Sequence, residues 1–357
     1  MDDARSSRAE APIHMGAKPI QGFVRDSWYV VAFSHEVTDA KPLARRCCGD
    51  PIVLFRDARG KAAALHDRCP HRGVPLSQGA PVEGALQCVY HGFRFGPDGA
   101  CTLVPSQRSI PPQMRTRAYP LVERAGFVWL WPGDPAKADA ALLPDHREIG
   151  LEREGWSVTP YFMLEIRSNY AMLFENLLDT SHVTYLHGGF LDTGDMASAT
   201  FTTEFGENRA KLVRSIPKVI PSRLIAKQYN LVEGESCTRE NTALALMPNL
   251  SIVQNRYSFP DQPGKPDHFR VNVMPITPAT MTTHYQFLTM ASSYVEPDHE
   301  TVKAMMLKVL KEDQVVLEAM QALYDEFGDD LPECSVRADV AGIKARRMLR
   351  DLATRES

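Results

Sequence analysis

Two cysteines and two histidines in the first third of the chain have the types and spacing of metal ligands. They stand in Cys69-Pro-His71 and in Cys88-Val-Tyr-His91, with 16 residues between His71 and Cys88. Thiolate sulfur and imidazole nitrogen both bind soft or borderline metals, and a structural zinc site is one such use. A single residue between Cys69 and His71 is closer than the usual zinc-finger spacing. We therefore favour a two-iron cluster, with the cysteines on one iron and the histidines on the other.

This stretch resembles the Rieske [2Fe-2S] motif. Pro70, the pair Arg72-Gly73 and the turn Tyr90-His91-Gly92 flank the four ligands as they do in that motif. Neutral imidazoles make the cluster less negative, so its potential is about −150 to +300 mV, against about −400 mV for an all-thiolate plant-type cluster. The resemblance therefore predicts an electron relay.

A second set of candidate ligands lies in residues 168–187, which we predict to be helical. Asn176, Asp179 and His182 are spaced three apart, so neighbours lie side by side on a helix. His187 follows five residues after His182, which is about 140° around an ideal helix. If both histidines bind one ion, the helix must depart locally from regular geometry, for example by a single π-turn. A lone helical histidine is more often a residue of the core.

Asp313 lies in a helix that we predict from about residue 298 to 327, on a stripe spaced by three and four. The other members of the stripe are Val302, Met306, Val309, Val316, Met320 and Leu323. We expect this stripe to face the core. A buried carboxylate must be paired, protonated or bound to a cation, so a salt bridge to a buried arginine is the structural alternative. Two histidines and one carboxylate form the ligand set of non-haem Fe(II) oxygenases, which leaves metal positions open.

The elements that hold these ligands divide the chain into three segments. We expect a flexible polar arm over residues 1–21, an all-β domain over 22–140 and a larger domain over 141–357. Short strand-like runs such as Trp28-Tyr-Val-Val-Ala-Phe and turn signals such as Gly96-Pro-Asp-Gly99 indicate the all-β domain, in which we see no helical periodicity. The two cluster loops are expected at its tip.

The larger domain follows a linker rich in proline and alanine and is predicted to combine an antiparallel sheet with helices. Its predicted elements are a strand at 156–166, a helix at 168–187, strand-like runs over 199–293, a helix at about 298–327 and a basic, amphipathic, solvated helix at about 339–354. Ser168 or Asn169 is the candidate N-cap of the second element, and Gly188-Gly189 ends it. The fold class is therefore α+β, with a helix-grip-like second domain.

Composition narrows the classes of function. Net charge is −4 over 357 residues, which gives no reason to expect nucleic acid as a partner. The sequence contains no apolar run of membrane-spanning length, so we expect no membrane association. Two of the seven cysteines are assigned to the cluster. The other five have no framework spacing and suggest reduced thiols in a cytoplasmic protein.

Taken together, the cluster motif, the N-x-x-D-x-x-H-x-x-x-x-H segment and the late helical aspartate resemble the catalytic subunits of Rieske non-haem iron oxygenases. The resemblance is strongest to the O-demethylase branch that vanillate O-demethylase and dicamba monooxygenase typify. It is also carried by Trp28-Tyr-Val-Val-Ala, by Glu123 to Asp134, by Ile276-Thr-Pro278 and by Glu312 to Glu318. Phe93 departs from the pattern, where the family often has tryptophan.

The resemblance implies a role for each candidate residue. Cys69, His71, Cys88 and His91 bind one Rieske [2Fe-2S] cluster, and His182, His187 and Asp313 bind one mononuclear Fe(II). Asp179 matches the acid that bridges a cluster histidine of one subunit to an iron-ligand histidine of the next, and holds that histidine in the right tautomer. Asn176 matches a residue near the iron. A head-to-tail homotrimer is implied as well.

The implied reaction is removal of a methyl or other alkyl group from an O- or N-alkylated aromatic compound, with O2. Electrons come from a partner reductase or ferredoxin, and NAD(P)H and flavin act through that partner. Ring or aliphatic C–H hydroxylation is the alternative reaction. A non-enzymatic Rieske electron carrier is a further alternative, with two irons per chain instead of three. Met274 takes the place of a histidine that helps hold the carboxylate of dicamba, so carboxylate recognition does not carry over.

Overall fold

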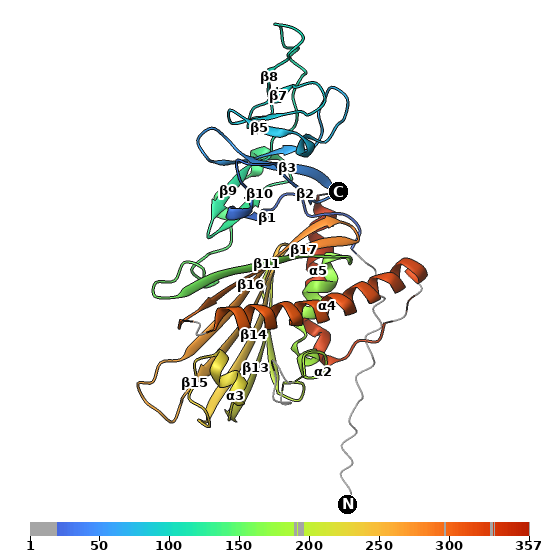
Figure 1. Cartoon of the computed structure of the whole chain (residues 1–357). Helices are drawn as coiled ribbons and strands as arrows, with labels where there is room; N and C mark the ends of the chain where they lie inside the picture. Colours follow the sequence, from blue (N-terminus) through green and yellow to red (C-terminus); the bar gives the residue numbers. More distant parts are fainter. Residues whose placement is uncertain are drawn as a thin grey trace, which may run out of the picture.

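The computed structural model describes residues 20–188, 191, 196–295, 298–328, 331 and 333–356. Figure 1 shows a group of small sheets stacked above one large sheet, which the long helix α4 (His299–Phe327) crosses. The predicted flexible arm over residues 1–21 lies outside the described residues except for Ile20 and Gln21. Ile20 is buried in the core of the larger domain, so that prediction is wrong for its last part.

The N-terminal part is built from β-strands and short 3-10 turns, and its described residues form no α-helix, in agreement with the prediction. Three antiparallel sheets have the strand orders β1 (Tyr29–Phe33), β10 (Phe127–Leu130), β9 (Leu121–Arg124); β2 (Leu43–Cys47), β3 (Asp50–Arg56), β4 (Ala62–His66); and β5 (Ala80–Val82), β6 (Ala85–Gln87), β7 (Arg94–Phe95), β8 (Cys101–Leu103).

Strand β10 shows why this part sits firmly on the rest of the molecule. Successive side chains of a strand point to opposite faces. Phe127 and Trp129 therefore pack towards the large sheet, while Val128 and Leu130 pack within the N-terminal part. All four are buried, which explains an apolar run without alternation.

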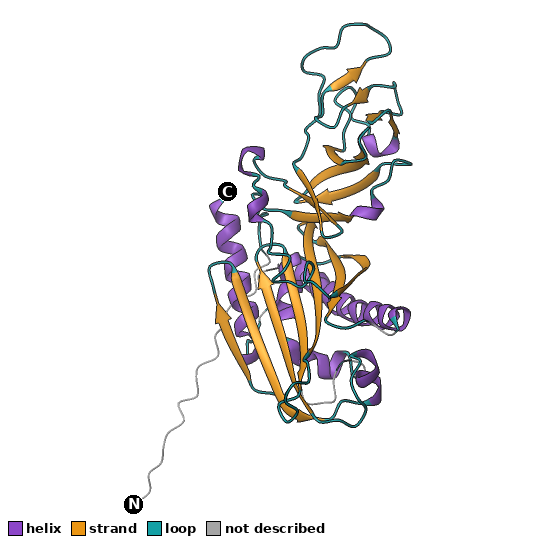
Figure 2. Ribbon diagram, turned by 90° about the vertical axis from the view of Figure 1, so that its left-hand side faces the viewer, coloured by secondary structure: helices purple, strands orange, loops and turns teal. Residues whose placement is uncertain are grey.

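The large sheet is antiparallel throughout, as predicted. Its strand order is β11 (Ser157–Ile166), β17 (Thr283–Ser292), β16 (His268–Thr280), β15 (Leu250–Ser258), β14 (Cys237–Leu246), β13 (Arg209–Val219), β12 (Phe201–Phe205). In β16, Met274 and Ile276 face a core shared with the helices, whereas Val271 and Val273 face a core shared with the N-terminal part. The sheet is thus covered on both faces at this strand, and Figure 2 shows helices against it.

Helices cover the face of the large sheet that carries Met274. They are α1 (Tyr170–Leu178), α2 (Val183–Leu186), α4 and α5 (Val340–Arg355), together with α3 (Arg223–Gln228) near one end of the strands. The sequence pattern did not predict α3 within the run of strands. Helix α5 is amphipathic as predicted, and it buries Ala341, Ala345 and Leu349 in the core.

The predicted helix over residues 168–187 is not continuous. Asn169 caps its start by accepting a hydrogen bond from the Ala171 N–H, as one of the two predicted N-caps, but α1 ends at Leu178. Asp179 has an extended backbone, and its carboxylate caps a new 3-10 turn at the Ser181 N–H. Aspartate competes for backbone donors in this way and so interrupts helices. Chain direction therefore changes at Asp179, without the suggested π-turn, and Gly189 lies outside the described residues.

The predicted apolar stripe of α4 faces the core over only part of its length. Val302, Met306, Val309 and Asp313 are buried, whereas Val316, Met320 and Leu323 are 37%, 39% and 45% exposed. A strict seven-residue repeat drifts by about 20° per heptad around a straight helix, so the buried side moves to other residues. These are Leu317, Gln321 and Tyr324. The C-terminal end of α4 also reaches beyond the sheet (Figure 1).

An ion-pair network fixes α1, which precedes the second candidate site, to α5. Arg346 Nε donates to Glu175 Oε1 at 2.6 Å, and Arg346 Nη1 lies 3.2 Å from Glu333 Oε2. These side chains are mostly buried, so removing the guanidinium leaves a carboxylate without its partner in a poorly hydrated place. We expect Arg346→Met to lower the free energy of unfolding by about 2–4 kcal/mol, measured by urea denaturation. Arg167→Met is the control, because its pair with Glu318 is exposed and should contribute at most about 1 kcal/mol.

Candidate metal centres and substrate pocket

The two cluster loops have the same backbone construction. In each loop the cysteine carbonyl accepts a hydrogen bond from a glycine four residues later, Gly73 at 2.9 Å and Gly92 at 3.0 Å. The cysteine N–H donates to the residue after that glycine, Val74 or Phe93, at 2.8 Å. Both glycines have positive φ, 77° and 71°, a conformation that glycine adopts without a Cβ penalty. The chain therefore turns tightly and brings each Cys-His pair to one point.

The four candidate cluster ligands form a buried pair of sulfurs and an accessible pair of rings. Cys69 and Cys88 are 3% and 2% exposed, while the rings of His71 and His91 lie 4.7 Å apart nearer the surface. Burial, and the neighbouring Cys88 thiol, raise the pKa of the free Cys69 thiol to about 11. Loss of hydration and the nearby His91 lower the pKa of His71, which favours the neutral imidazole that binds metal.

A single zinc ion does not fit this arrangement. A tetrahedral site needs all four ligand atoms to converge on one ion. Among the described residues, three or more His, Cys, Asp or Glu side chains bring their ligand atoms within 4.8 Å of one another at one place, and the four cluster ligands do not form it. Separate sulfur and imidazole pairs fit two irons, as the Rieske ligand set requires.

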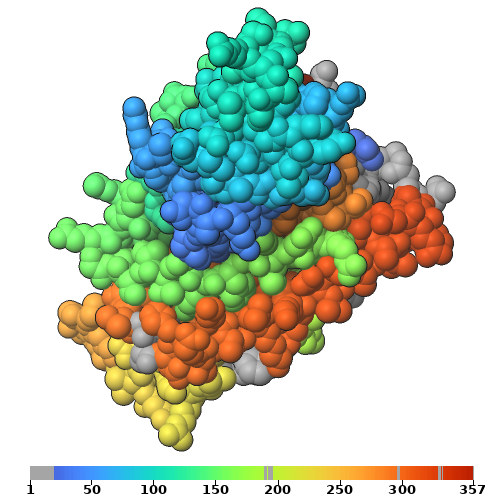
Figure 3. All heavy atoms as spheres, turned by 45° about the horizontal axis from the view of Figure 1, so that its top comes forward, coloured from blue at the N-terminus to red at the C-terminus, as the bar shows by residue number. Residues whose placement is uncertain are grey.

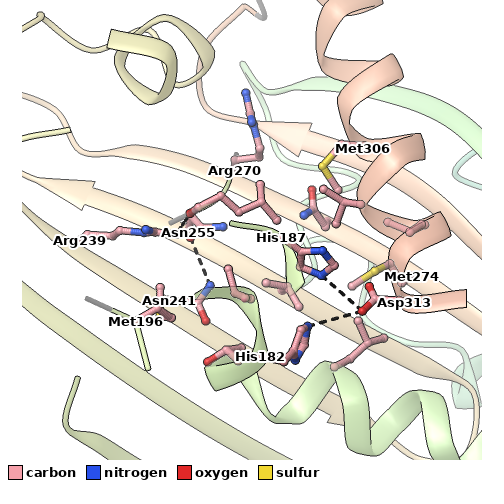
Figure 4. Close-up of a pocket in the computed structure, with 18 of the residues that line it drawn as sticks. His182, His187, Met196, Arg239, Asn241, Asn255, Arg270, Met274, Met306 and Asp313 are labelled. Atoms are coloured by element: carbon pink, nitrogen blue, oxygen red, sulfur yellow. Dashed lines mark hydrogen bonds and ion pairs between the residues drawn. The ribbon is translucent and has the colours of Figure 1, made fainter. Parts of the chain in front are cut away.

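That one place is formed by His182, His187 and Asp313. Asp313 Oδ1 lies 3.6 Å from His182 Nε2 and 3.3 Å from His187 Nε2, so both imidazoles present the same ring nitrogen to the carboxylate. Figure 4 shows the three side chains pointing towards one another from α4 and from the segment after α1. Two imidazoles and one carboxylate can hold an Fe(II) ion with positions left open. The structural alternative was a salt bridge between Asp313 and a buried arginine. The two imidazoles face the carboxylate instead.

The break at Asp179 explains how histidines five residues apart reach one ion. His182 ends the 3-10 turn, and His187 follows the last residue of α2. The two rings lie 5.2 Å apart at an interplanar angle of 79°. On a regular helix the two side chains would point about 140° apart around the helix axis.

Each imidazole is oriented by an acceptor at its other nitrogen. His182 Nδ1 is hydrogen-bonded to the backbone carbonyl of Asp179, and His187 Nδ1 lies 2.9 Å from Glu312 Oε2. Burial lowers the pKa of His187, but the hydrogen bonds and charges of Asp313 and Glu312 outweigh it and the pKa is raised. The sequence analysis missed Glu312. Neighbouring helix positions lie about 100° apart, so the residue before Asp313 can reach the other nitrogen of a histidine that Asp313 faces, and this position was the available signal.

Asn176 and Asp179 take different places around this centre. Asn176 Nδ2 donates to Asp313 Oδ1 at 3.0 Å and so holds the carboxylate. The Asp179 carboxylate instead accepts from the Ser181 N–H and hydroxyl, both at 2.9 Å. Within one chain the partner of His182 Nδ1 is therefore the Asp179 carbonyl.

A pocket opens beside the metal triad, and His182, His187 and Asp313 form part of its wall. Apolar side chains line much of it, among them Leu177, Val183, Val253, Met274, Met306, Val309 and Leu310. Met274, a guess from sequence, does belong to this wall. The wall also contains polar side chains that the sequence analysis did not identify, among them Arg239, Asn241, Asn255, Arg270 and Asn272.

The Glu312 contact leads to a prediction about metal affinity. A carboxylate that accepts the Nδ1–H of a ligand histidine orients the ring and makes its other nitrogen a stronger donor. We expect Glu312→Leu to weaken metal binding by about ten- to a hundredfold, measured by Co(II) titration of the metal-free protein. Glu318→Leu is the matched control on the same helix, since Glu318 contacts Arg167 and Gln314 instead. Equal affinities in the two variants would contradict the role of Glu312.

No helix within the described residues has the length and apolarity that a membrane crossing requires.

Comparisons with known proteins agree with both sites. The model of the Rieske [2Fe-2S] domain matches residues 27–120, and that of the vanillate O-demethylase oxygenase C-terminal domain matches residues 166–355. The oxygenase component of dicamba O-demethylase from Stenotrophomonas maltophilia is 30% identical over 94% of this chain and 99% of its own length. The oxygenase component of chloroacetanilide N-alkylformylase from Rhizorhabdus wittichii is 30% identical over 92% and 94%.

A solved structure is also similar over nearly its whole length. Dicamba monooxygenase bound to 3,6-dichlorosalicylic acid superimposes with a TM-score of 0.85 at 28% identity, covering 94% of this chain and 99% of that one. The match spans both the cluster part and the pocket part. The chain therefore belongs to the vanillate O-demethylase family of Rieske non-haem iron oxygenases, which carry a [2Fe-2S] cluster and a mononuclear iron.

Proposed function

We propose that this chain is a monooxygenase that removes a methyl or other alkyl group from the oxygen or nitrogen of an aromatic compound. The observation that carries the proposal is the metal triad of His182, His187 and Asp313 at the wall of a largely apolar pocket. Relatives named for O-demethylation of dicamba and for N-alkylformylase activity on chloroacetanilides support it.

In this proposal the chain positions the substrate and holds the ligands. When bound, the cluster supplies electrons and the iron activates O2. Leu177, Val183 and Leu310 line the pocket and keep water from the alkyl group. Asn176 holds Asp313 by its hydrogen bond, and the acceptors at both Nδ1 atoms direct the Nε2 atoms to the metal. Hydroxylation of the alkyl carbon gives a hemiacetal or hemiaminal, which collapses to an aldehyde and the dealkylated aromatic.

The overall balance for a methyl ether is one ether, one O2, two electrons and two protons in, and one phenol, one formaldehyde and one water out. Ring or aliphatic C–H hydroxylation would use the same oxidant and electrons but release no aldehyde. The decisive experiment therefore scores a panel of aromatic ethers and N-alkyl compounds by aldehyde release in the presence of a reductase. Hydroxylated products without aldehyde would favour the alternative reaction.

We further propose that the electron path crosses between subunits of a head-to-tail homotrimer. His91 and its neighbours Val89 and Tyr90 are exposed and lie in the loop between β6 and β7. Figure 1 places β5, β7 and β8 at the opposite end of the molecule from α2. Electron transfer needs centres that are close, so a cluster from a second subunit is the better donor. A heterologous interface closes into a three-membered ring if its rotation is about 120°.

The charges around both ends support this contact. Arg68 and Arg72 flank the cluster loop and are exposed. Four carboxylates and one cation, Arg346, line a hollow that includes Asp179, so its charge is negative; the other three carboxylates are Glu175, Glu333 and Asp339. Opposite charges on the two surfaces favour their association. Asp179 would then accept a hydrogen bond from the free ring N–H of His71 or His91 of the neighbouring subunit, because a ligated histidine has one nitrogen left.

The remaining assignments follow from this function. We propose a ferredoxin or reductase as the electron donor, with NAD(P)H and flavin held by that partner, and a cytoplasmic location, where such donors and reduced thiols occur. We also keep the division into a Rieske domain over 22–140 and a catalytic domain over 141–357. The two family models, at residues 27–120 and 166–355, lie on either side of that boundary.

A further inference from the structure

Three neighbouring strands place a polar group of side chains on the pocket wall. Asn241 of β14 lies opposite Asn255 of β15, and Asn255 lies opposite Arg270 of β16. Arg239 is two residues before Asn241 and so points to the same face of the sheet. All four are more than nine-tenths buried. Figure 4 shows Asn241 and Asn255 on one side of the pocket and the metal triad on the other.

The hydrogen bonds among these side chains fix which atom Asn241 presents to the pocket. Arg239 Nη2 donates to the Leu191 carbonyl at 2.8 Å and to Asn255 Oδ1 at 3.4 Å. A guanidinium group can only donate, so the oxygen of Asn255 must face it. Asn241 Nδ2 donates to that same oxygen at 3.2 Å. A turned Asn241 amide would bring two oxygens together, so its own Oδ1 points away from Asn255.

Asn241 Oδ1 is a buried acceptor that receives no hydrogen bond from the part of the chain that the structure describes. Asn272, on the next strand but one and also lining the pocket, has an Oδ1 in the same condition. Buried acceptors of this kind are normally satisfied by the protein, by ordered water or by a bound molecule, and these two line the pocket. A substrate that supplies a donor would complete the wall.

We infer that the substrate carries a hydrogen-bond donor, a phenolic O–H or an amide or amine N–H, which Asn241 Oδ1 accepts while the alkyl group lies at the metal triad. This inference rests on the proposed dealkylation for the position of the alkyl group. It selects aromatic ethers and N-alkyl compounds that keep a second, unalkylated O–H or N–H. Fully alkylated analogues would leave the Asn241 oxygen unpaired and so bind weakly.

The test compares matched compounds on the iron-loaded protein without O2. The three methoxyphenols are titrated against the corresponding dimethoxybenzenes, and N-alkylanilines with a second, free amide N–H against their N-methylated amides, by calorimetry. We expect the donor-bearing member of at least one pair to bind about tenfold or more tightly. In Asn241→Leu, which has no acceptor, that ratio should fall to near one. In Asn241→Asp, which keeps an acceptor, the ratio should persist.

The result that would overturn the inference is the absence of any such preference in the native protein, or a preference that Asn241→Leu leaves unchanged. Formaldehyde release, measured separately with reductase and O2, distinguishes this failure from failure of the proposed function. Turnover of methoxyphenols and dimethoxybenzenes with equal binding removes the inference and leaves dealkylation standing. A clear binding preference combined with hydroxylated products and no aldehyde supports the inference about the donor and contradicts dealkylation.

Discussion

Asp313→Ala is expected to abolish turnover while leaving the visible absorption of the [2Fe-2S] cluster unchanged. Asp313 is 3% exposed, and both imidazole Nε2 atoms face its carboxylate. Without it the mononuclear site has two neutral ligands and loses the metal. A bound metal ion lowers the reaction barrier by several kcal/mol, so its loss should reduce the rate by about a thousandfold or more. His182→Ala and His187→Ala should give the same result for the same reason.

The opposite pattern is expected for the cluster ligands. Cys69→Ala or His91→Ala should remove the visible absorption, while the mononuclear site still binds one iron. Asp325→Ala is the control for Asp313→Ala on the same helix, because Asp325 Oδ1 accepts a hydrogen bond from Gln321 Nε2. Iron analysis and absorption spectra separate the cases. An active Asp313→Ala enzyme would show that the late aspartate is a structural residue, and cluster absorption in Cys69→Ala would remove the Rieske assignment.

The parts of the site that could be predicted are those written in short stretches of sequence. The cluster ligands sit in two loops whose Cys-to-Gly hydrogen bonds each span five successive residues, so spacing and glycine position together indicate the geometry. Asp313 was found because a carboxylate interrupts an apolar helical stripe. The five-residue separation of His182 and His187 looked unfavourable on a continuous helix. It became favourable because Asp179 caps a new turn, which short-range preferences for aspartate do indicate.

What could not be predicted depends on contacts between distant segments. The polar wall of the pocket comes from β14, β15 and β16, and it forms because the register places Asn241 opposite Asn255 and Asn255 opposite Arg270. Each of these residues alone reads as an ordinary strand residue. The exposed end of α4 has the same origin, since helical periodicity cannot reveal where the sheet beneath it ends. Antiparallel strands with alternating inward residues were predictable. Which residues of neighbouring strands lie opposite each other was not, because this depends on the register.

The last prediction tests the inter-subunit path by mixing two inactive chains. Cys69→Ala has no cluster but an intact iron site, and His182→Ala has the reverse. Co-expressed in equal amounts, they should form mixed rings in which half of the clusters are intact and half of the neighbouring iron sites are intact. About a quarter of the interfaces then join a good cluster to a good iron, so activity should return to about a quarter of the native value.

An electron path inside one subunit predicts a different outcome, because no chain in the mixture holds both intact centres. Activity would then stay absent at every mixing ratio. Two differently tagged chains, purified through both tags in turn, show that mixed oligomers are present and make a negative result meaningful. Purified native enzyme that sediments as a monomer while active would also exclude the ring. Varying the ratio adds a sharper criterion, since the recovered activity should be highest at equal amounts and fall off equally on either side.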